Sequence, residues 1–573
     1  AGGRWYFHQL FVNGGRRRRP RLPKEGRYTV KGVPATHSFA PEYWGAEGNF
    51  YCNDGEIEAW ENLTDVDVVA MHRWVEERLP ISSFDPETNR VESSRYCIFP
   101  LDPGDAADGQ APKFYVDNVK EALSEPGEWY LDRPTGELCY IPLEGEKMES
   151  AEIFAPVIEQ LIRLEGDPES RQYVEQLHFV GIGFEHTEWS LPPGGGERWV
   201  PHYQAELDYG SAPPGACHVP GAISFYGARY CSLEDCTVQH IGWYGIELTA
   251  GSQGNYIVGN NILDLGAGGL KTESRGYPNS EVPLERHTGA NRITDNHIGD
   301  GGHVFHAALG VHCMECFGTV IAHNHIHDFF YSGVNCGWSW GYGEHIAKDN
   351  LIEKNHIHDI GHAVLSDMGA IYMLGVQPGT VVRGNVVHDV EKSAYGGWGI
   401  YLDEGSSHMI VENNISYNCS SQAFVQHYGR ENIVRNNIFA LGREGQVRLG
   451  RGEDHNAFTF ERNVVITNGQ PCYTGGRRWM VEKKAISTDL NLFWDVSGAP
   501  LLCGSAPHGL PQNEYDMEGW QGLGYDIHSV IADPKCRDIA NSDFTLEKDS
   551  PAWALGFKPI DVSDVGPRAR EDR

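Results

Sequence analysis

Two acidic segments stand out among the residues that could catalyse a reaction. Asp367 lies in the segment LSDMGAIYMLG, and Asp403 and Glu404 lie further along the chain in GGWGIYLDEGSS. Two carboxylates that lie close together repel each other, which raises the pKa of one and keeps it protonated near neutral pH. Such a pair can supply the general acid and the nucleophile for cleavage of a glycosidic bond. Either segment alone would be typical of an Asx turn, in which Asp caps backbone N–H groups.

Aromatic and polar residues flank both acidic segments. Those that could bind a substrate are Tyr372, Trp398, Tyr401, His427, Tyr428 and Arg430. Aromatic faces pack against the C–H surfaces of sugars, and polar groups bind the hydroxyls. His427 could equally be a core residue with satisfied hydrogen bonds. Trp338, in the loop CGWSWGYGEH, is a candidate sugar platform or else part of a packed loop.

A repeated phrase, hydrophobic-x-x-Asn-x-Ile/Val, indicates how these segments are brought together. Its asparagines are Asn260, Asn296, Asn324, Asn355, Asn385, Asn413, Asn436 and Asn463. A spacing of about 23 to 36 residues is typical of a solenoid. Short β-branched runs alternate with Gly, Asn and His-Asp turns, which predicts strand-turn-strand units. We therefore predict a right-handed parallel β-helix in which the asparagines stack at a coil corner and hydrogen-bond along the stack.

Alternation along each strand predicts which side chains face outward. A small residue precedes an aliphatic one in YGIELT, GGLKTE, SGVNC, GAIYML and WGIYLDE. If the aliphatic residue points into the core, the residues one and three positions later point out. The outward set is Glu247, Lys271, Glu273, Asn335, Tyr372, Tyr401 and Asp403. Lys271, Glu273 and Asn335 thus join the candidate substrate-binding residues, and Asp403 is favoured over Glu404 as a catalytic carboxylate.

The motif His-x-His-Asp, at residues 325–328 and 356–359, could in principle bind a metal. Because it recurs in frame with the asparagine repeat, we expect it to serve turn hydrogen bonding, and we predict no metal site. No cofactor is expected to be required, although a structural Ca²⁺ could be bound without leaving a motif.

Composition limits the partners. The 46 basic and 79 acidic residues give a formal charge of −33, which opposes binding to nucleic acid and to anionic membranes. No apolar stretch approaches a membrane span. We expect a secreted or periplasmic protein, its signal peptide outside this chain, that binds an oligo- or polysaccharide as a monomer or small homo-oligomer.

The chain divides into four predicted regions. Residues 1–27 form an N-terminal entry segment of the β-helix, and residues 28–150 form an inserted β-rich, sandwich-like module that lacks the asparagine repeat. Residues 151–470 form the parallel β-helix with its groove. Residues 471–573 form C-terminal coils and capping loops, because the repeat loosens there.

Several phrases resemble a known enzyme family. SDMGAIYMLG, GWGIYLDEGSS and QHYGRENIVRNNIF, together with EPGEWYLDRPTGELCYIPLEGE, are similar to glycoside hydrolase family 141, a group of secreted β-helix enzymes. That resemblance implies α-L-fucosidase activity or, alternatively, a xylan-acting hydrolase (xylanase or β-xylosidase). The related family 120 contains retaining β-xylosidases with an Asp nucleophile and a Glu acid/base. The resemblance implies an acidic pair at Asp367 and either Asp403 or Glu404.

Two other functions are compatible with the fold. A polysaccharide lyase needs a base and a means of neutralising a uronate, usually Ca²⁺ or a basic cluster, and the outward residues include only Lys271 and Arg430 as cations. A non-catalytic adhesin would bind glycans without releasing product. The sequence leaves open the sugar and linkage, exo or endo action, the stereochemical outcome and the oligomeric state.

Overall fold

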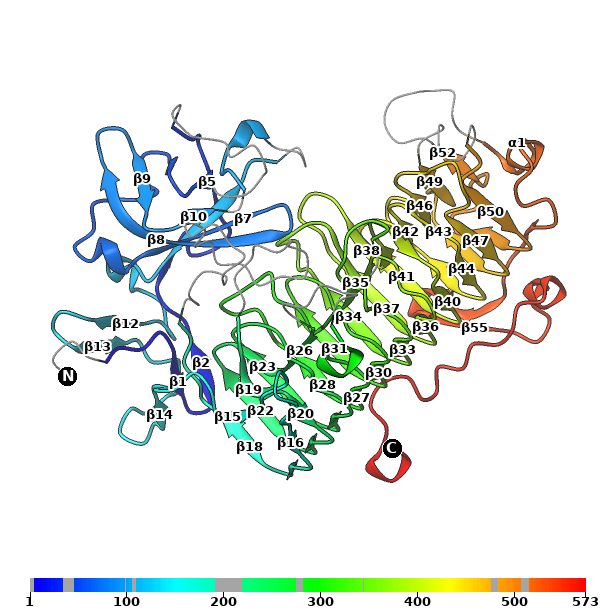
Figure 1. Ribbon diagram of the computed structural model, residues 1–573. Helices are drawn as coiled ribbons and strands as arrows, with labels where there is room; N and C mark the ends of the chain where they lie inside the picture. The colour runs from blue at the N-terminus through cyan, green and yellow to red at the C-terminus, as the bar shows by residue number, and fades with distance from the viewer. Residues whose placement is uncertain are drawn as a thin grey trace.

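The structure is a computed structural model of the chain, and it describes residues 5–34, 46–97, 99–105, 110–190, 219–274, 282–343, 345–475, 483–505 and 515–573. Parallel strands form three long sheets that stack coil upon coil, as Figure 1 shows. The predicted right-handed parallel β-helix is confirmed. No helix among the described residues is both long and apolar enough to cross a membrane.

The first sheet, called PB1 here, carries the two acidic segments. Its strands, in spatial order, are β15 (Ile162–Glu165), β19 (Gly221–Tyr226), β23 (Tyr244–Thr249), β26 (Leu270–Glu273), β29 (Val311–Met314), β32 (Val334–Gly337), β35 (Met368–Leu374), β38 (Gly397–Leu402), β42 (Phe424–Gln426), β46 (Val447–Leu449), β49 (Tyr473–Gly475) and β52 (Gly504–Ser505). Spatial order follows chain order, so each strand pairs with those one coil away.

The second sheet, PB2, follows PB1 within each coil. Its strands are β17 (His178–Val180), β21 (Ser232–Glu234), β24 (Tyr256–Val258), β27 (Arg292–Thr294), β30 (Val320–Ala322), β33 (Leu351–Glu353), β36 (Val381–Arg383), β40 (Ile410–Glu412), β44 (Asn432–Arg435), β47 (Phe458–Glu461) and β50 (Ile486–Asp489).

The third sheet, PB3, closes each coil. Its strands are β18 (Gly183–Glu185), β22 (Thr237–Ile241), β25 (Asn261–Leu265), β28 (His297–Gly299), β31 (His325–Phe329), β34 (His356–Ile360), β37 (Val386–Val390), β41 (Ile415–Cys419), β45 (Ile438–Ala440), β48 (Val464–Thr467), β51 (Leu492–Asp495) and β53 (Val530–Ile531). Aliphatic side chains from all three sheets fill the interior as one continuous hydrophobic cluster.

An N-terminal module lies beside the solenoid (Figure 1). Its main sheet contains β3 (Arg21–Leu22), β4 (Tyr28–Thr29), β6 (Phe50–Tyr51), β7 (Asp67–His72), β8 (Val75–Asp85), β9 (Arg90–Ser93) and β11 (Lys113–Asp117), and β12 (Trp129–Asp132) forms a hairpin with β13 (Glu137–Tyr140). We expected residues 1–27 to enter the β-helix. Instead, β1 (Leu10–Val12) and β2 (Gly15–Arg17) pair antiparallel with β14 (Ile153–Phe154), and β3 joins the module sheet.

Buried asparagines link successive coils at the corner between PB2 and PB3. Asn355 donates through Nδ2 to Asn385 Oδ1 at 2.9 Å and to the Ile321 carbonyl at 2.9 Å, while its own Oδ1 accepts from Asn324 Nδ2 at 2.9 Å. The same pattern extends from Asn260 to Asn491. Buried amides are stable only when their donors and acceptors are paired, and the ladder pairs them.

The predicted ladder was wrong by one residue at two corners. Asn414 and Asn437 occupy the ladder, whereas Asn413 and Asn436 precede it with φ values of 58° and 54°. The prediction located each asparagine by the aliphatic residue two positions later, which was assumed to point inward. Ile415 and Ile438 instead face outward, where Phe544 of the C-terminal segment covers them.

Replacement of one ladder asparagine should destabilise the whole solenoid. We expect Asn355→Ala to lower the free energy of unfolding by about 2–4 kcal/mol, because buried partners above and below lose their hydrogen bonds. Chemical denaturation monitored by circular dichroism would measure the change. Asn468→Ala, at an exposed turn, is the matched control and should change stability by less than about 0.5 kcal/mol. Equal effects of the two substitutions would contradict a stabilising ladder.

Candidate functional site

Small inward-pointing residues lie beside the outward side chains of PB1. A Cβ added at Gly333 would meet the Ala370 carbonyl oxygen at 2.7 Å, and one added at Gly399 would meet the Ala423 carbonyl oxygen at 2.6 Å. These positions are therefore restricted to very small residues that point inward, as does the aliphatic residue that follows. The outward side chains on either side converge, and the rings of Trp398 and Tyr401 have centroids 4.3 Å apart.

The strand register aligns one outward residue from each coil. Glu247, Lys271, His312, Asn335, Tyr372 and Tyr401 are successive register partners. Alternation along the strands had predicted this set except for His312. Consecutive coils stand about 4.8 Å apart, so each residue can contact only its nearest neighbours in the column.

Asp403 is held as an acceptor of two hydrogen bonds. Tyr372 Oη donates to Asp403 Oδ2 at 2.6 Å, and His427 Nδ1 donates to Asp403 Oδ1 at 2.9 Å. Burial alone would lower the pKa of His427, but the hydrogen bond and the charge of Asp403 outweigh burial and raise that pKa. Asp403 is only 6% exposed. Donors on both oxygens stabilise the ionised form of this carboxyl group.

Asp367 lies in a turn whose backbone is held from three sides. Its N–H donates to the Tyr395 carbonyl at 3.0 Å, and its own carbonyl accepts from Tyr331 Oη at 2.8 Å. The preceding residue, Ser366, donates its N–H to the carbonyl of Arg73 in the N-terminal module at 2.8 Å. The module therefore contacts the turn that carries Asp367.

Burial raises the pKa of Asp367 to about 7, and the negative charge of Asp403 adds to the increase. The Tyr395 hydroxyl, 3.3 Å from Asp367 Oδ2, acts in the opposite direction. Asp367 is thus largely protonated at slightly acidic pH, next to a carboxylate whose two hydrogen bonds favour its charged form. An acid and a base kept in different protonation states within one site can cleave a bond by proton transfer.

Glu404, Tyr428 and Arg430 lie at the rim of this site. Tyr428 Oη donates to Glu404 Oε2 at 3.2 Å, and the Glu404 side chain is 34% exposed. Arg430 stacks over the ring of Tyr342, with its guanidinium carbon 4.7 Å from the centroid. His427 Nδ1 lies 3.8 Å from Glu404 Oε1 but 2.9 Å from Asp403 Oδ1, and Tyr372 donates to Asp403 as well. This geometry favours Asp403 as the partner of Asp367.

The remaining predicted residues separate into near and distant groups. Trp338 is buried, and its ring centroid lies 5.0 Å from that of Tyr372. Asn335, one coil from Tyr372, is fully buried. Lys271 lies three coils from Tyr372, where its ammonium group donates to the carbonyl of Val219, and Glu273 is buried on the same strand. Lys271 and Glu273 are therefore too distant to contact a sugar held at Asp403.

Sequence reasoning missed three residues of the site. Tyr395 lies in an irregular loop and carried no repeat signal. His312 could have been found, because it follows Val311 in the same inward–outward alternation that identified its neighbours. Gln422 accepts a hydrogen bond from Trp398 Nε1 at 2.9 Å and thereby fixes the orientation of the indole ring.

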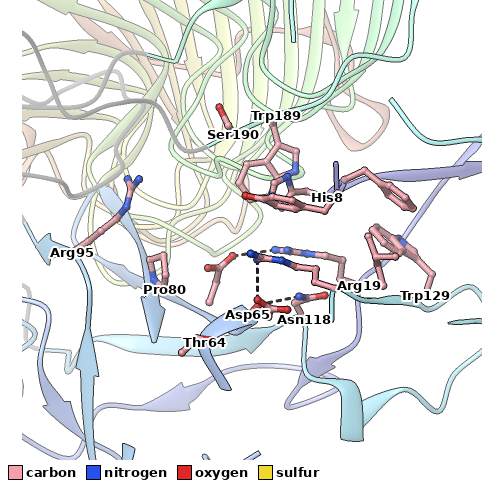
Figure 2. A pocket seen from close by; sticks show the side chains of 15 residues that line it. His8, Arg19, Thr64, Asp65, Pro80, Arg95, Asn118, Trp129, Trp189 and Ser190 are labelled. Atoms are coloured by element: carbon pink, nitrogen blue, oxygen red, sulfur yellow. Dashed lines mark hydrogen bonds and ion pairs between the residues drawn. The ribbon is translucent and has the colours of Figure 1, made fainter. Parts of the chain in front are cut away.

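A second hollow, between the module and the start of the solenoid, is not a catalytic centre of the same kind. Figure 2 shows this pocket of about 300 Å³, in which Arg19, Asp65, Trp129 and Trp189 are labelled. Asp65 pairs with Arg133 at 2.8 Å, and Arg19 pairs with two neighbouring aspartates. Its carboxylates are already neutralised by arginines, so it offers no free acid–base pair among the described residues.

Comparisons with known proteins agree on the architecture. A family model described as "Right handed beta helix region" matches residues 221–394 and 338–486. The chain is 27% identical over 191 residues to "Uncharacterized protein YwoF" of Bacillus subtilis (strain 168), a match covering 28% of this chain. The chain spans 41% of that relative's length.

Two solved structures are also similar. One, described as "Glycoside hydrolase", is 22% identical with a TM-score of 0.62, covering 75% of this chain and 77% of the other. "The complex structure of XylC with xylose" is 11% identical with a TM-score of 0.38, covering 96% and 87%. Together with the family model, the first of these shows that the fold is a right-handed parallel β-helix.

The raised pKa of Asp367 should appear in the pH dependence of stability. The pKa of Asp367 is about 7 in the folded chain and near 3.9 in the unfolded chain. The contribution of this group to the free energy of unfolding is therefore fully present at low pH and is lost as the pH rises through 7. Asp367→Asn, which stays neutral, should be more stable than the parent at mildly alkaline pH by about 1–3 kcal/mol and equal to it near pH 4. Denaturation at both pH values would measure this.

Asp295→Asn is the matched control of opposite sign. Burial would raise the pKa of Asp295, but hydrogen bonds and charge from Arg568 outweigh burial and lower it. This substitution should therefore lower stability at alkaline pH. A pH-independent effect of Asp367→Asn would contradict the assignment.

Proposed function

We propose that this protein is a glycoside hydrolase in which Asp367 is the general acid and Asp403 the opposing carboxylate. The observation that supports this proposal is the different surroundings of the two carboxyl groups. Burial and the charge of Asp403 raise the pKa of Asp367 to about 7, whereas Tyr372 and His427 donate hydrogen bonds to Asp403. Glycosidases require one protonated and one ionised carboxyl group.

The proposed reaction begins with proton transfer from Asp367 to the glycosidic oxygen, so that the leaving group departs as a neutral alcohol. Asp403 acts on the anomeric carbon, either directly or by removing a proton from water. Tyr372 and His427 orient Asp403 through their hydrogen bonds. The positive charge that develops on the sugar ring in the transition state is stabilised by the carboxylate.

For the substrate we propose a terminal α-L-fucosyl residue. A 6-deoxy sugar carries a methyl group, and the clustered rings of Trp398, Tyr401 and Tyr372 supply an apolar surface for it. The buried position of Asp403 suits a single terminal sugar better than a long chain. A xylan-acting hydrolase is the second candidate, since the resemblance to families 141 and 120 implies both activities. A lyase is less well supported, because the centre is acidic and Lys271 is bound to a main-chain carbonyl three coils away.

Two substrates with different leaving groups would distinguish the roles of the carboxylates. Asp403→Asn should lower kcat on both 4-nitrophenyl α-L-fucoside and a fucosyl disaccharide by about 10³-fold or more, because it removes the group that acts at the anomeric carbon. Asp367→Asn should reduce hydrolysis of the disaccharide by a similar factor. Its effect on the nitrophenyl substrate should be smaller, because nitrophenolate leaves without protonation. Release of product in steady-state assays would measure both.

Glu404→Gln is the matched control and should retain activity within about tenfold of the parent, since Glu404 accepts from Tyr428 at the rim and lies 3.8 Å from His427, further than Asp403 does. A parallel screen with aryl xylosides and xylan tests the second candidate. Near-normal turnover by both aspartate variants on their preferred substrate would overturn the proposed mechanism.

Asn335 should contribute to binding without contributing to stability. Within the described part of the chain, neither its Nδ2 nor its Oδ1 has a hydrogen-bond partner, although the residue is fully buried. We expect Asn335→Leu to leave the melting temperature unchanged or higher, because an unsatisfied buried amide is removed. The kcat/KM should fall by about 10- to 100-fold through loss of a hydrogen bond to a sugar hydroxyl.

Gln377→Leu is the matched control for Asn335→Leu. The Gln377 amide is equally buried but donates to the carbonyl of Cys336 at 3.1 Å. Its loss should lower the melting temperature with little effect on KM. Destabilisation by Asn335→Leu with unchanged kinetics would show that the amide has a structural role.

A further inference from the structure

Six histidines form a continuous ladder on the outer face of PB3, away from the acidic pair. An inner column contains His297, His325 and His356, which are register partners on β28, β31 and β34. An outer column contains His327, His358 and His388 on β31, β34 and β37. Neighbouring rings within the columns stack, as for His325 and His356, whose centroids are 5.2 Å apart at an interplanar angle of 11°.

The two columns face each other through their Nε2 atoms. The Nε2–Nε2 distance is 2.7 Å between His297 and His327 and 2.7 Å between His325 and His358. Two triads, His297–His325–His327 and His325–His356–His358, each place their ligand atoms within 4.8 Å of one another. Both triads contain His325.

The outer histidines have the carboxylate partners that metal-binding imidazoles require. His327 Nδ1 donates to Asp328 at 2.7 Å, and His358 Nδ1 donates to Asp359 at 2.7 Å. Both aspartates have positive φ values, 55° and 52°, which turn their side chains back onto the preceding ring. A carboxylate on Nδ1 fixes the tautomer in which Nε2 carries the lone pair, and this arrangement recurs behind histidine ligands of zinc. We expected the His-x-His-Asp motif to serve turn hydrogen bonding. The same His–Asp hydrogen bonds also place the lone pair of the outer imidazole on Nε2, the atom that would bind a metal.

The outer histidines of the ladder are partly accessible. The side chains of His327 and His358 are 17% and 18% exposed. Among the described residues, the acidic group of potential ligands, Asp264–Asp300–His303, is by contrast already bound by Arg16, which pairs with Asp264 at 2.5 Å.

We propose that this histidine ladder binds one divalent late transition-metal ion, of the Zn²⁺ class, across the coils that contain β28, β31 and β34. Three imidazoles without carboxylate ligands suit zinc, nickel or copper rather than calcium or magnesium. His325 offers a single Nε2, so only one triad can be complete at a time. A fourth position remains for water.

Binding requires the three ligand atoms to adjust their spacing. Zinc lies about 2.0–2.1 Å from each imidazole nitrogen, so two ligands of a tetrahedral ion stand roughly 3.3 Å apart. The facing Nε2 atoms, 2.7 Å apart, must therefore separate by about 0.6 Å, and the third ligand atom, within 4.8 Å of the others, must approach by up to about 1.5 Å. The ion replaces the hydrogen that the inner imidazole shares with its outer partner. That proton moves to Nδ1 of the inner ring, so the rings remain neutral.

Zinc titration of the full chain, stripped with EDTA and dialysed at slightly alkaline pH, tests the proposal. Isothermal titration calorimetry should give one site per chain, and saturating zinc should raise the melting temperature, since a ligand that binds only the folded state stabilises it. His325→Gln removes the residue common to both triads and should abolish binding and the thermal shift. His528→Gln is the matched control, because His528 pairs with Asp489 at 2.7 Å outside the ladder. It should bind zinc as the parent does.

A second variant keeps the test decisive if His325→Gln folds poorly. Asp359→Asn retains all six histidines and should weaken zinc binding by about tenfold or more, because it releases His358 from its fixed tautomer. Each variant is also titrated with Cys139→Ser added, because Cys139 is an exposed thiol. Absence of binding by the parent at millimolar zinc would overturn the proposal, as would unchanged affinity in both His325→Gln and Asp359→Asn.

Discussion

The asparagine ladder is the constraint on which the rest of the molecule depends. Each ladder amide donates to the next coil and to a main-chain carbonyl of the previous one, so a coil cannot slip by one residue without leaving several buried groups unpaired. The left-handed residue before each ladder asparagine makes the corner tight. A fixed corner sets the register of PB1 and PB3 at the same time. Both the acidic site and the histidine ladder are consequences of that register.

Within PB1, the arrangement of the candidate site depends on small residues that point inward. Because Gly399 and Ile400 both point inward, Trp398 and Tyr401 meet on the outer face, where Tyr401 influences the pKa of Asp367. The same crowding limits the access of water to Asp403, which is buried, whereas Asp367 is partly buried. Burial of charge is unfavourable, and the protein reduces this cost by keeping Asp367 protonated and by surrounding Asp403 with donors. The burial of the acidic pair therefore accounts both for the proposed reactivity of the two carboxyl groups and for their unfavourable contribution to stability.

The sequence predicts most features of the repeated coils and few features of the irregular loops and of the module that packs against them. Alternation of small, aliphatic and polar residues was enough to place Asn335, Tyr372, Tyr401 and Asp403 on one face, because a two-residue period is local. It could not identify Tyr395 or the contact between Ser366 and Arg73, since these depend on irregular loops and on the docking of a distant module. The prediction was wrong by one residue at Asn414 because it took Ile415 to point inward, whereas Ile415 packs with Phe544 of the C-terminal segment.

In a solenoid, side chains at the same register position of successive coils form a column. The asparagine ladder, the histidine ladder and the outward residues of PB1 are arranged in this way and differ in the direction in which their side chains point. Each corner asparagine lies next to another asparagine inside the core. Each side-chain amide hydrogen-bonds to the next, so this column has a structural role. Histidine on PB3 faces its own kind near the surface, where facing Nε2 atoms share a hydrogen that the proposed metal ion would replace. The PB1 column breaks the repetition, with Asn335, Tyr372 and Tyr401 in successive coils. Diversity is required there because a substrate is asymmetric, whereas a stacking interaction or a metal ion is served by identical neighbours. The position at which a column stops repeating is thus the position of the proposed sugar site.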